Sequence, residues 1–229
     1  MQTSEFLMAF AHDLRQPLRS ILMVTQRLQR GSGELSPEMR TRLDEIGAAA
    51  RRQDELIAGA VEYEQALQAP ASGEISLALR LAIQTACMKV EAFRHARKGL
   101  IHFDAHQVPQ VFAPSGLARL LEKVLHNSLK FQLDGASPVI EITATEVEGG
   151  MVEVRVSDNG LGIQSQYRES VFKPFERLNA ASDFPGSGLG LSICKRLADN
   201  MKGTIRFEDS KAEQGVALVL RFPTSGMKS

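Results

Sequence analysis

Apolar side chains recur every three or four residues along the first thirty positions, and this spacing constrains the fold more than any other feature. It predicts one amphipathic helix over residues 3–30. A turn at 31–37 follows, in which Ser36 can cap a second helix and Pro37 can occupy its first position. The second helix is expected to run to about residue 68. The stripes consist of Leu7, Ala11, Leu14, Leu18, Ile21, Thr25 and Leu28, then Met39, Leu43, Ile46, Ala50 and Ile57.

Two such helices cannot close a hydrophobic core alone, because each covers only part of the other's stripe. Each helix would be about 40 Å long at a rise of 1.5 Å per residue. The economical way to bury the remaining apolar surface is to pair with a second copy as a four-helix bundle. We therefore expect residues 1–70 to form a dimerising antiparallel helical hairpin, and the chain to be a homodimer.

A small-residue segment, APASGE at 69–74, predicts a domain boundary. Beyond it, residues 139–147 and 151–158 alternate apolar and polar side chains around the turn EGG, as the strands of an antiparallel hairpin do. Helices packed on one face of a mainly antiparallel sheet give an α+β sandwich over residues 71–229. The other expected elements are helices at 77–93, 115–132 and 188–202 and strands at 101–104, 204–208 and 216–222.

The overall composition excludes several classes of protein. The 27 basic residues equal the 27 acidic ones, so charge gives no case for a nucleic-acid or membrane-surface partner. Cys87 and Cys194 are far apart and match no ligand pattern, which favours a reducing, cytoplasmic setting. The apolar runs, such as VALVL at 216–220, are much shorter than the roughly 20 residues that cross a bilayer. No secretory signal is recognisable at the start of the chain.

The segment FAHDLRQPL at 10–18 contains the candidate catalytic residues of the first helix. His12 follows the stripe residue Ala11, so it should lie at the margin of the buried face. A neutral imidazole is a good nucleophile near pH 7, and Asp13 could hold its N–H or accept its proton. The alternative is a partly buried structural histidine. Pro17 cannot donate to the carbonyl of Asp13, so a bend is expected just after His12.

Three further motifs could bind a nucleotide. DNGLGI at 158–163 follows a strand, and Asp158 could accept a hydrogen bond from the adenine amine. GSGLGL at 186–191 enters a helix, where backbone N–H groups can approach a phosphate. HNSLKF at 126–131 places Asn127 and Lys130 on one helix face, with an amide for Mg²⁺ and an ammonium for phosphate. Each motif alone also fits a tight turn, a close-packed junction or a solvated surface.

Taken together, FAHDLRQPL, HNSLKF, DNGLGI, FKPFERL (172–178) and GSGLGL resemble the H, N, G1, F and G2 boxes of the transmitter module of two-component sensor histidine kinases. The His-Asp pair and the sequence leading into GSGLGL are most similar to the phytochrome-related branch. The resemblance covers about residues 4–222. It implies a dimeric helical hairpin followed by a GHKL-type α/β sandwich that binds ATP.

The resemblance also implies a role for each matching residue. His12 would be the phospho-acceptor and Asp13 its base or orienting group, and Gln16 stands where phosphatase-competent relatives align a water. Asn127 would be the Mg²⁺ ligand and Asp158 the adenine-reading carboxylate. The remaining ATP-site residues would be Lys130, Phe131, Gly160, Gly162, Arg177, Gly186, Gly188, Leu189 and Gly190. Many relatives have Asn or an acid where this chain has Lys123, which leaves the metal shell open.

The implied activity is autophosphorylation of His12 from Mg-ATP, followed by transfer to an aspartate on the receiver domain of a response regulator. A sensor domain would act in cis or in trans, and we expect an upstream coiled coil because the heptad pattern begins near residue 4. A phosphotransfer or scaffold protein with little kinase activity is the alternative. A related ATPase would need a glutamate one turn before Asn127, but Lys123 is there, and Glu122 points about 100° away. The histidine argues against a Ser/Thr kinase.

Overall fold

The computed structural model describes residues 2–31, 35–68, 77–179, 184–210, 214–223 and 225–226 of the 229-residue chain. These fall into two compact units. The first comprises Met1–Gln68 and Asn179–Leu189, and the second comprises Ala69–Leu178 and Gly190–Ser229. The boundary segment predicted at 69–74 lies outside the described residues.

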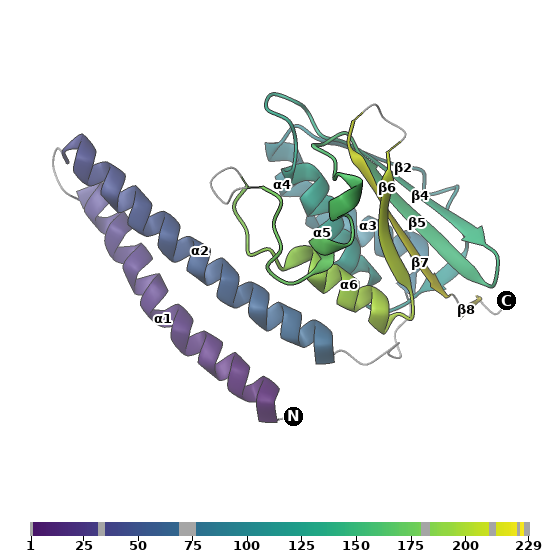
Figure 1. Ribbon diagram of the computed structural model, residues 1–229, viewed down its shortest axis with the longest axis horizontal. Coiled ribbons are helices and arrows are strands. Elements are labelled where there is room, and N and C mark those ends of the chain that lie inside the picture. Colours follow the sequence, from purple (N-terminus) through teal and green to yellow (C-terminus); the bar gives the residue numbers. More distant parts are fainter. Residues whose placement is uncertain are drawn as a thin grey trace. The chain divides into compact units, whose positions relative to one another are not determined.

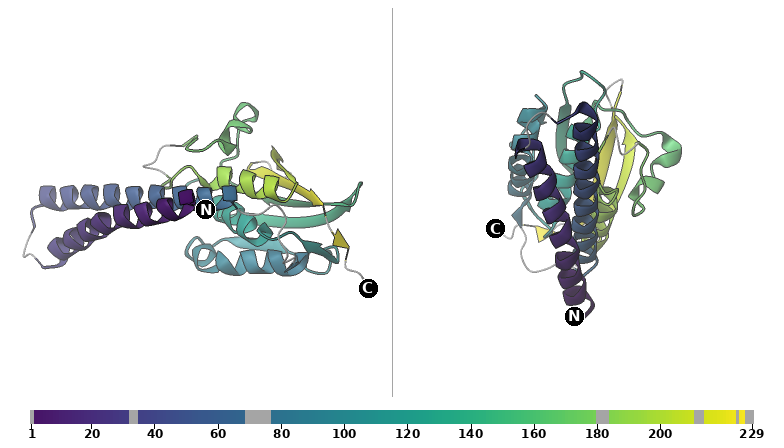
Figure 2. Two further views of the ribbon diagram at one scale, coloured as in Figure 1. Left: turned by 90° about the horizontal axis from the view of Figure 1, so that it is seen from below. Right: turned by 90° about the vertical axis from the view of Figure 1, so that its left-hand side faces the viewer.

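The first unit is built on a helical hairpin, as the stripes predict. α1 spans Gln2–Gly31 and α2 spans Pro37–Gln68, and the two helices run antiparallel (Figure 1). Ser36 caps α2 as expected, because the backbone N–H of Met39 donates to its Oγ at 3.2 Å. α1 continues through Pro17 and curves along its length (Figure 2), so the expected bend takes the form of a curved, unbroken helix.

Only part of the apolar stripe on α1 is covered within one hairpin. Ala11, Leu18 and Thr25, spaced by seven residues, are buried, with 6–7% of their surface exposed. The parallel row of Leu14, Ile21 and Leu28 remains 41–47% exposed. On α2, Leu43 and Ala50 are buried while Met39 and Ile46 are about half exposed. A single hairpin therefore presents an uncovered apolar row along each helix.

The second unit contains a five-stranded sheet in the order β2-β4-β5-β7-β6. β2 pairs with β4 in parallel, and the other pairs are antiparallel. A small second sheet, in the order β1-β3-β8, is also present. The strands are β1 Leu77–Ala78, β2 Leu100–Phe103, β3 Val111–Ala113, β4 Val139–Val147, β5 Met151–Asp158, β6 Thr204–Asp209, β7 Val216–Pro223 and β8 Ser225–Gly226.

Helices pack against one face of the large sheet and form the core with it. Along β4 and β5 the alternate residues, such as Ile142 and Val156, which face each other in register, are buried. α5 supplies an apolar face to this core that includes Leu121 and Leu125. The helices are α3 Leu79–Lys89, α4 Glu91–Ala96, α5 Leu117–Lys130 and α6 Gly190–Asn200, with 3₁₀ turns η1 Ser165–Tyr167 and η2 Ser170–Phe172. The α+β sandwich expected from the sequence is confirmed.

The single helix expected at 77–93 is wrong. Residues 77–78 form strand β1, α3 ends at Lys89, and α4 begins at Glu91. Val90 between them has φ −95° and ψ 2°, outside the helical well, and this allows α4 to start in a new direction. Among the described residues, no helix is both long enough and apolar enough to cross a membrane.

Candidate active site

His12 lies on the outer side of the hairpin, next to the buried Ala11. Its side chain is 63% exposed and that of Asp13 is 79% exposed. Nδ1 of His12 lies 3.4 Å from Oδ1 of Asp13, a long contact between neighbouring residues. This contact favours the tautomer with hydrogen on Nδ1 and leaves the Nε2 lone pair facing solvent. Gln16, one turn further along α1, is also exposed.

An ion pair fixes α1 to α2 one turn after His12. Arg15 donates to Asp54 through Nε at 2.6 Å and through Nη2 at 3.1 Å. These hydrogen bonds lower the pKa of Asp54 and raise that of Arg15. A two-bond pair of this kind sets the relative positions of the two helices more strictly than apolar packing alone. It therefore supports the backbone on which His12 stands.

Asp158 of the second unit is held by donors from three different segments of the chain. It ends β5, and Ser128 of α5 donates to its Oδ2 at 2.8 Å. The backbone N–H groups of Gly160 and Val216 donate to its Oδ1 at 3.0 and 3.4 Å. Burial raises the pKa of Asp158, and these three donors act against that rise. The result is a half-buried acceptor with a fixed orientation.

Two glycines allow the backbone to close around Asp158. A Cβ on Gly160 would lie 2.3 Å from the carbonyl oxygen of Phe131, and one on Gly215 would lie 1.9 Å from the carbonyl oxygen of Asp158. Gly215 also has φ +99°, which strongly favours glycine. The N–H of Leu161 donates to Phe131 at 3.1 Å and joins the segment after β5 to the end of α5. Gly162 lies nearby and also has a positive φ.

Three predicted ATP-site residues follow one another at the end of α5. Asn127 accepts a hydrogen bond from the N–H of Phe131 through its backbone carbonyl, at 2.9 Å. The ammonium of Lys130 lies 4.7 Å from the centre of the Phe131 ring. The side chain of Asn127 lies beside the start of α6, where a Cβ on Gly190 would be 3.8 Å from its Nδ2. Asn127, Lys130, Phe131 and Gly190 thus share the second unit with Asp158.

The sequence predicts a lid over ATP at 161–187, because this segment is too long for a plain turn. In the structure the segment is divided between the units. Arg177 is exposed and belongs to the second unit, whereas Gly186, Gly188 and Leu189 belong to the first. Gly188 has φ +73° and Leu189 is buried. Residues 180–183 lie outside the described part of the chain.

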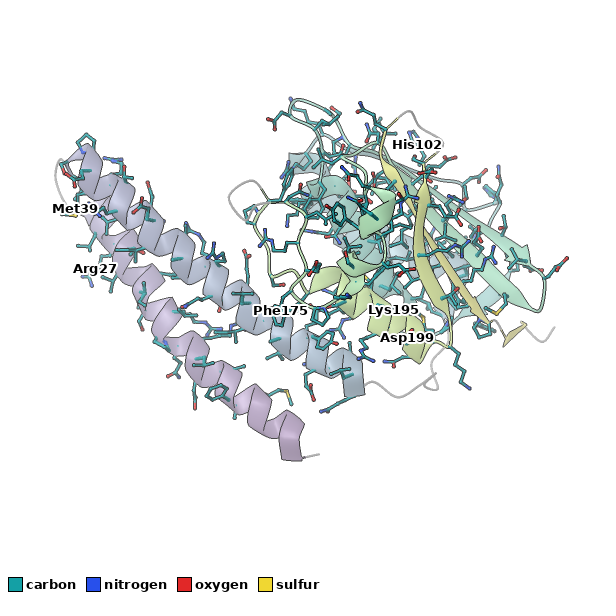
Figure 3. The ribbon with its side chains drawn as sticks, viewed as in Figure 1. Arg27, Met39, His102, Phe175, Lys195 and Asp199 are labelled. Carbon is teal, nitrogen blue, oxygen red and sulfur yellow. The ribbon has the colours of Figure 1, made fainter. Side chains whose placement is uncertain are left out.

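The lid prediction also assigns Phe172 and Phe175 to anchor this segment by apolar packing. Phe172 packs as expected: its ring stacks on that of Phe207 in β6, with 5.3 Å between the ring centroids. The expectation is wrong for Phe175, which is 61% exposed and has φ +65° (Figure 3). The tight turn after Pro174 directs its ring away from the core, so Phe172 alone of the two supplies apolar packing.

Sequence reasoning missed the residues that support Asp158. Ser128 lies inside the motif HNSLKF, so its position could have drawn attention, but nothing in the sequence links it to a carboxylate thirty residues later. Gly215 precedes the last long strand, where a glycine usually signals only a turn. Val216 acts through its backbone N–H, which leaves no trace in the sequence.

Comparison with known families agrees with this geometry. Residues 2–66 match the His Kinase A (phospho-acceptor) domain. Residues 112–226 match the family of histidine kinase-, DNA gyrase B- and HSP90-like ATPases. This chain belongs to the sensor histidine kinases. It is a transmitter module in which a phospho-acceptor hairpin precedes an ATP-binding domain.

Individual relatives of this histidine kinase core agree with the assignment. Sensor protein KdpD of Rathayibacter rathayi is 34% identical over 55% of this chain and 14% of its own length. The kinase/phosphatase MprB of Mycolicibacterium paratuberculosis is 38% identical over 50% of this chain and 22% of its own. Cyanobacterial phytochrome A of a Nostoc species is 28% identical over 98% of this chain and 29% of its own. The chain therefore spans under a third of these curated relatives.

Solved structures share the fold. A mycobacterial MprB sensor histidine kinase structure covers 68% of this chain and all of its own, with a TM-score of 0.55 and 26% identity. The full-length ShkA structure in complex with AMPPNP covers 98% of this chain and 47% of its own, with a TM-score of 0.69 and 22% identity.

Proposed function

We propose that this transmitter module phosphorylates its own His12 from Mg-ATP and then passes the phosphoryl group to an aspartate on a response-regulator receiver domain. The observation that carries the proposal is the exposed His12 with its free Nε2, in the same chain as a half-buried Asp158 that accepts three hydrogen bonds. The first is a nucleophile on an accessible hairpin, and the second is an acceptor for the adenine amine. Together they provide the phosphoryl acceptor and a contact for the adenine of the phosphoryl donor.

The transfer step needs one lone pair and one proton acceptor. Nε2 of His12 attacks the γ-phosphorus of ATP, a P–N bond forms, and the bond to the bridging oxygen breaks to release ADP. The imidazole then loses the Nδ1 proton, and Asp13 is the carboxylate beside that nitrogen. Phosphoryl transfer depends mainly on positioning and charge neutralisation. Lys130 and Arg177 are the cations we assign to the phosphates.

The residues present fit a magnesium ion that is shared with the nucleotide. The described residues contain no cluster of three or more His, Cys, Asp or Glu side chains that could hold a metal. Mg²⁺ is often held by one or two protein oxygens together with phosphate oxygens and waters. The amide of Asn127, beside the start of α6, can supply one such oxygen. When bound, the ion would neutralise charge on the phosphates.

The partners follow from the hairpin and the family. The exposed rows on α1 and α2 support a homodimer with a four-helix bundle, because a second copy would cover them. A receiver domain is the acceptor that the family implies, and a sensor domain would control the hairpin. We also place the chain in the phytochrome-like branch, on its similarity to cyanobacterial phytochrome A along nearly its whole length. Exposed Gln16 is the residue that could align a water for phosphatase activity.

Incubation with γ-labelled ATP and Mg²⁺ tests the proposal. We expect acid-labile, base-stable label in the wild type, none in His12→Gln, and normal label in the control His102→Gln, whose histidine is exposed on β2 (Figure 3). Label that persists in His12→Gln would identify another acceptor. Absence of label in a wild-type protein that binds ADP would favour the phosphotransfer or scaffold alternative.

A further inference from the structure

Lys123 lies on the same face of α5 as two of the residues assigned to ATP. Each residue of an α-helix advances by about 100°, so Lys123 projects within about 40° of Asn127 and about 20° of Lys130. All three are half-buried, whereas Leu121 and Leu125 on the opposite side belong to the core. Lys123 precedes Asn127 by one helical turn, and Lys130 follows it by nearly one. The two lysines therefore flank the residue assigned to magnesium.

The order of these residues along α5 matches the direction in which a bound nucleotide would run. Asp158, the assigned acceptor for the adenine amine, is bonded to Ser128 near the C-terminal end of α5. From there toward the start of the helix, the face presents Lys130, then Asn127, then Lys123. At a rise of 1.5 Å per residue, Lys123 lies about 10 Å from Lys130 along the axis. Because the phosphates extend away from the adenine, the last of them is the one nearest Lys123.

A stack of side chains brings a third cation beside this face. The ring of His126 stacks on that of Phe93 in α4, with 4.4 Å between the ring centroids. The guanidinium of Arg97 lies 5.5 Å from the centre of the Phe93 ring. The stack thus joins α4 to α5 and places Arg97 near the exposed side of α5.

The surroundings of His126 show that positive charge is concentrated here. Loss of water contact and then three positive charges lower the pKa of this histidine. The three charges belong to Lys130, Lys123 and Arg97. Glu122 acts in the opposite direction, and its carboxylate is bonded at 3.0 Å to the lysine that ends α3. Cations so close together repel one another, and an anionic ligand beside them would relieve the repulsion.

We propose that Lys123 is a further substrate-contacting residue, whose ammonium donates hydrogen bonds to the γ-phosphate oxygens of ATP. A protonated amine has three N–H donors and no lone pair, so Lys123 suits a phosphate and cannot be a magnesium ligand. Its charge stabilises the γ-phosphoryl group while the bond to ADP breaks. The inference rests on the proposed binding of ATP. It adds a residue that distinguishes ATP from ADP, because ADP lacks the phosphate that Lys123 contacts.

The test measures the dissociation constants of the full chain for ADP and for AMPPNP, an ATP analogue that keeps the third phosphate, at one fixed Mg²⁺ concentration. Lys123→Met keeps the length of the side chain and removes its charge. We expect this variant to lose roughly tenfold in affinity for AMPPNP, and less than about twofold for ADP, because a hydrogen bond to a charged group is lost with AMPPNP alone. Lys123→Arg keeps the charge and should retain most of the preference for AMPPNP.

Lys195→Met is the matched control, because it removes the same charge from another helix. Lys195 lies on α6 and is bonded to Asp199 at 2.8 Å (Figure 3). Both dissociation constants should be unchanged in this variant. An effect as large as that of Lys123→Met would mean that net charge, and not contact with the γ-phosphate, favours AMPPNP, and would overturn the inference.

The ratio of the two constants separates this inference from the proposed function. If Lys123→Met leaves the ratio unchanged, or weakens both nucleotides equally, Lys123 does not contact the third phosphate and the inference is overturned while nucleotide binding stands. If neither nucleotide binds the wild type, the proposed function itself fails. Should Lys123→Met not fold, Lys123→Gln decides by the same ratio, because glutamine is neutral and favours helix as well as lysine does.

Discussion

The guanidinium of Arg15 on α1 holds the carboxylate of Asp54 on α2 through two hydrogen bonds, one turn from the exposed His12. The pair is partly exposed, with 34% and 29% of the two side chains accessible. Solvent screening therefore limits the contribution of this ion pair to the free energy of folding. Its geometry is nevertheless the two-bond form that stabilises most.

We expect Asp54→Asn and Arg15→Gln each to lower the free energy of unfolding of the hairpin by about 0.5–1 kcal/mol. Chemical denaturation of both single variants and the double variant would give the coupling energy. Because Arg15 lowers the pKa of Asp54 below its ordinary 3.8, this stabilisation is present above that value and is lost as the pH falls through the lowered pKa. A coupling energy of zero at pH 7 would contradict the prediction.

The raised pKa of Asp158 predicts an acid-sensitive nucleotide site. The ionised carboxylate accepts from the adenine amine, so ADP affinity should fall as the pH drops through a pKa above the ordinary 3.8. Asp158→Asn should bind weakly with little pH dependence over the same range. Titration calorimetry at several pH values measures both. A wild-type affinity that begins to fall only below the ordinary value would count against this prediction.

The same pKa shift has a consequence for folding. Since folded Asp158 takes up its proton at a higher pH than the unfolded chain does, stability should decrease as the pH rises from about 3.8 through the raised pKa. Removing the charge in Asp158→Asn should abolish this component of the pH dependence. Thermal melts of both proteins across the acidic range would reveal the difference.

Gly215 provides a test of the close backbone approach around Asp158. Gly215→Ala would place a Cβ 1.9 Å from a carbonyl oxygen at a positive φ, so we expect a loss of more than about 3 kcal/mol of stability and weaker ADP binding. Gly149→Ala is the matched control, because Gly149 also has a positive φ, +79°, but nothing lies within 4 Å. The control should lose only about 1 kcal/mol. Equal losses in the two variants would mean that backbone strain alone, without the steric clash, accounts for the effect.

The uncovered row on α1 predicts how the chain associates. Ile21→Asp places a charge in the middle of this row and should convert a dimer into monomers, whereas Gln26→Asp, on an exposed position outside the row, should leave the dimer intact. Light scattering at several protein concentrations measures the mass. A wild-type protein that is monomeric at high concentration would refute the homodimer.

The contribution of Asp13 to phosphoryl transfer can be distinguished from that of His12 by measuring the rate of autophosphorylation. Asp13→Asn keeps the size of the side chain but removes the proton acceptor beside Nδ1 of His12. We expect the rate of autophosphorylation to fall by about 10²–10⁴-fold, with ADP affinity unchanged. Single-turnover labelling gives the rate, and an unaltered rate would assign Asp13 no part in the proton transfer.

Elements in which apolar residues recur regularly over many positions could be predicted from the sequence. The β4–β5 hairpin has the predicted bounds because eight or nine alternating residues define both strands. The strands β1, β3 and β8 have two or three residues, which is too short for any period to be visible. In the site, Asp158 and Gly160 belong to a local motif, whereas Gly215 and Val216 matter only because the fold brings them beside Asp158.

The donors that hold Asp158 come from three separate stretches of the chain: the end of α5, the turn after β5 and the start of β7. Any local unfolding that detaches one stretch removes its donor and weakens the nucleotide site. Nucleotide therefore binds the closed state in preference to the locally unfolded one. Bound nucleotide thus acts as a folding ligand. The concentration of ATP should therefore determine how fast proteases degrade this chain. At low nucleotide concentration the locally unfolded state is more populated, and cleavage is faster.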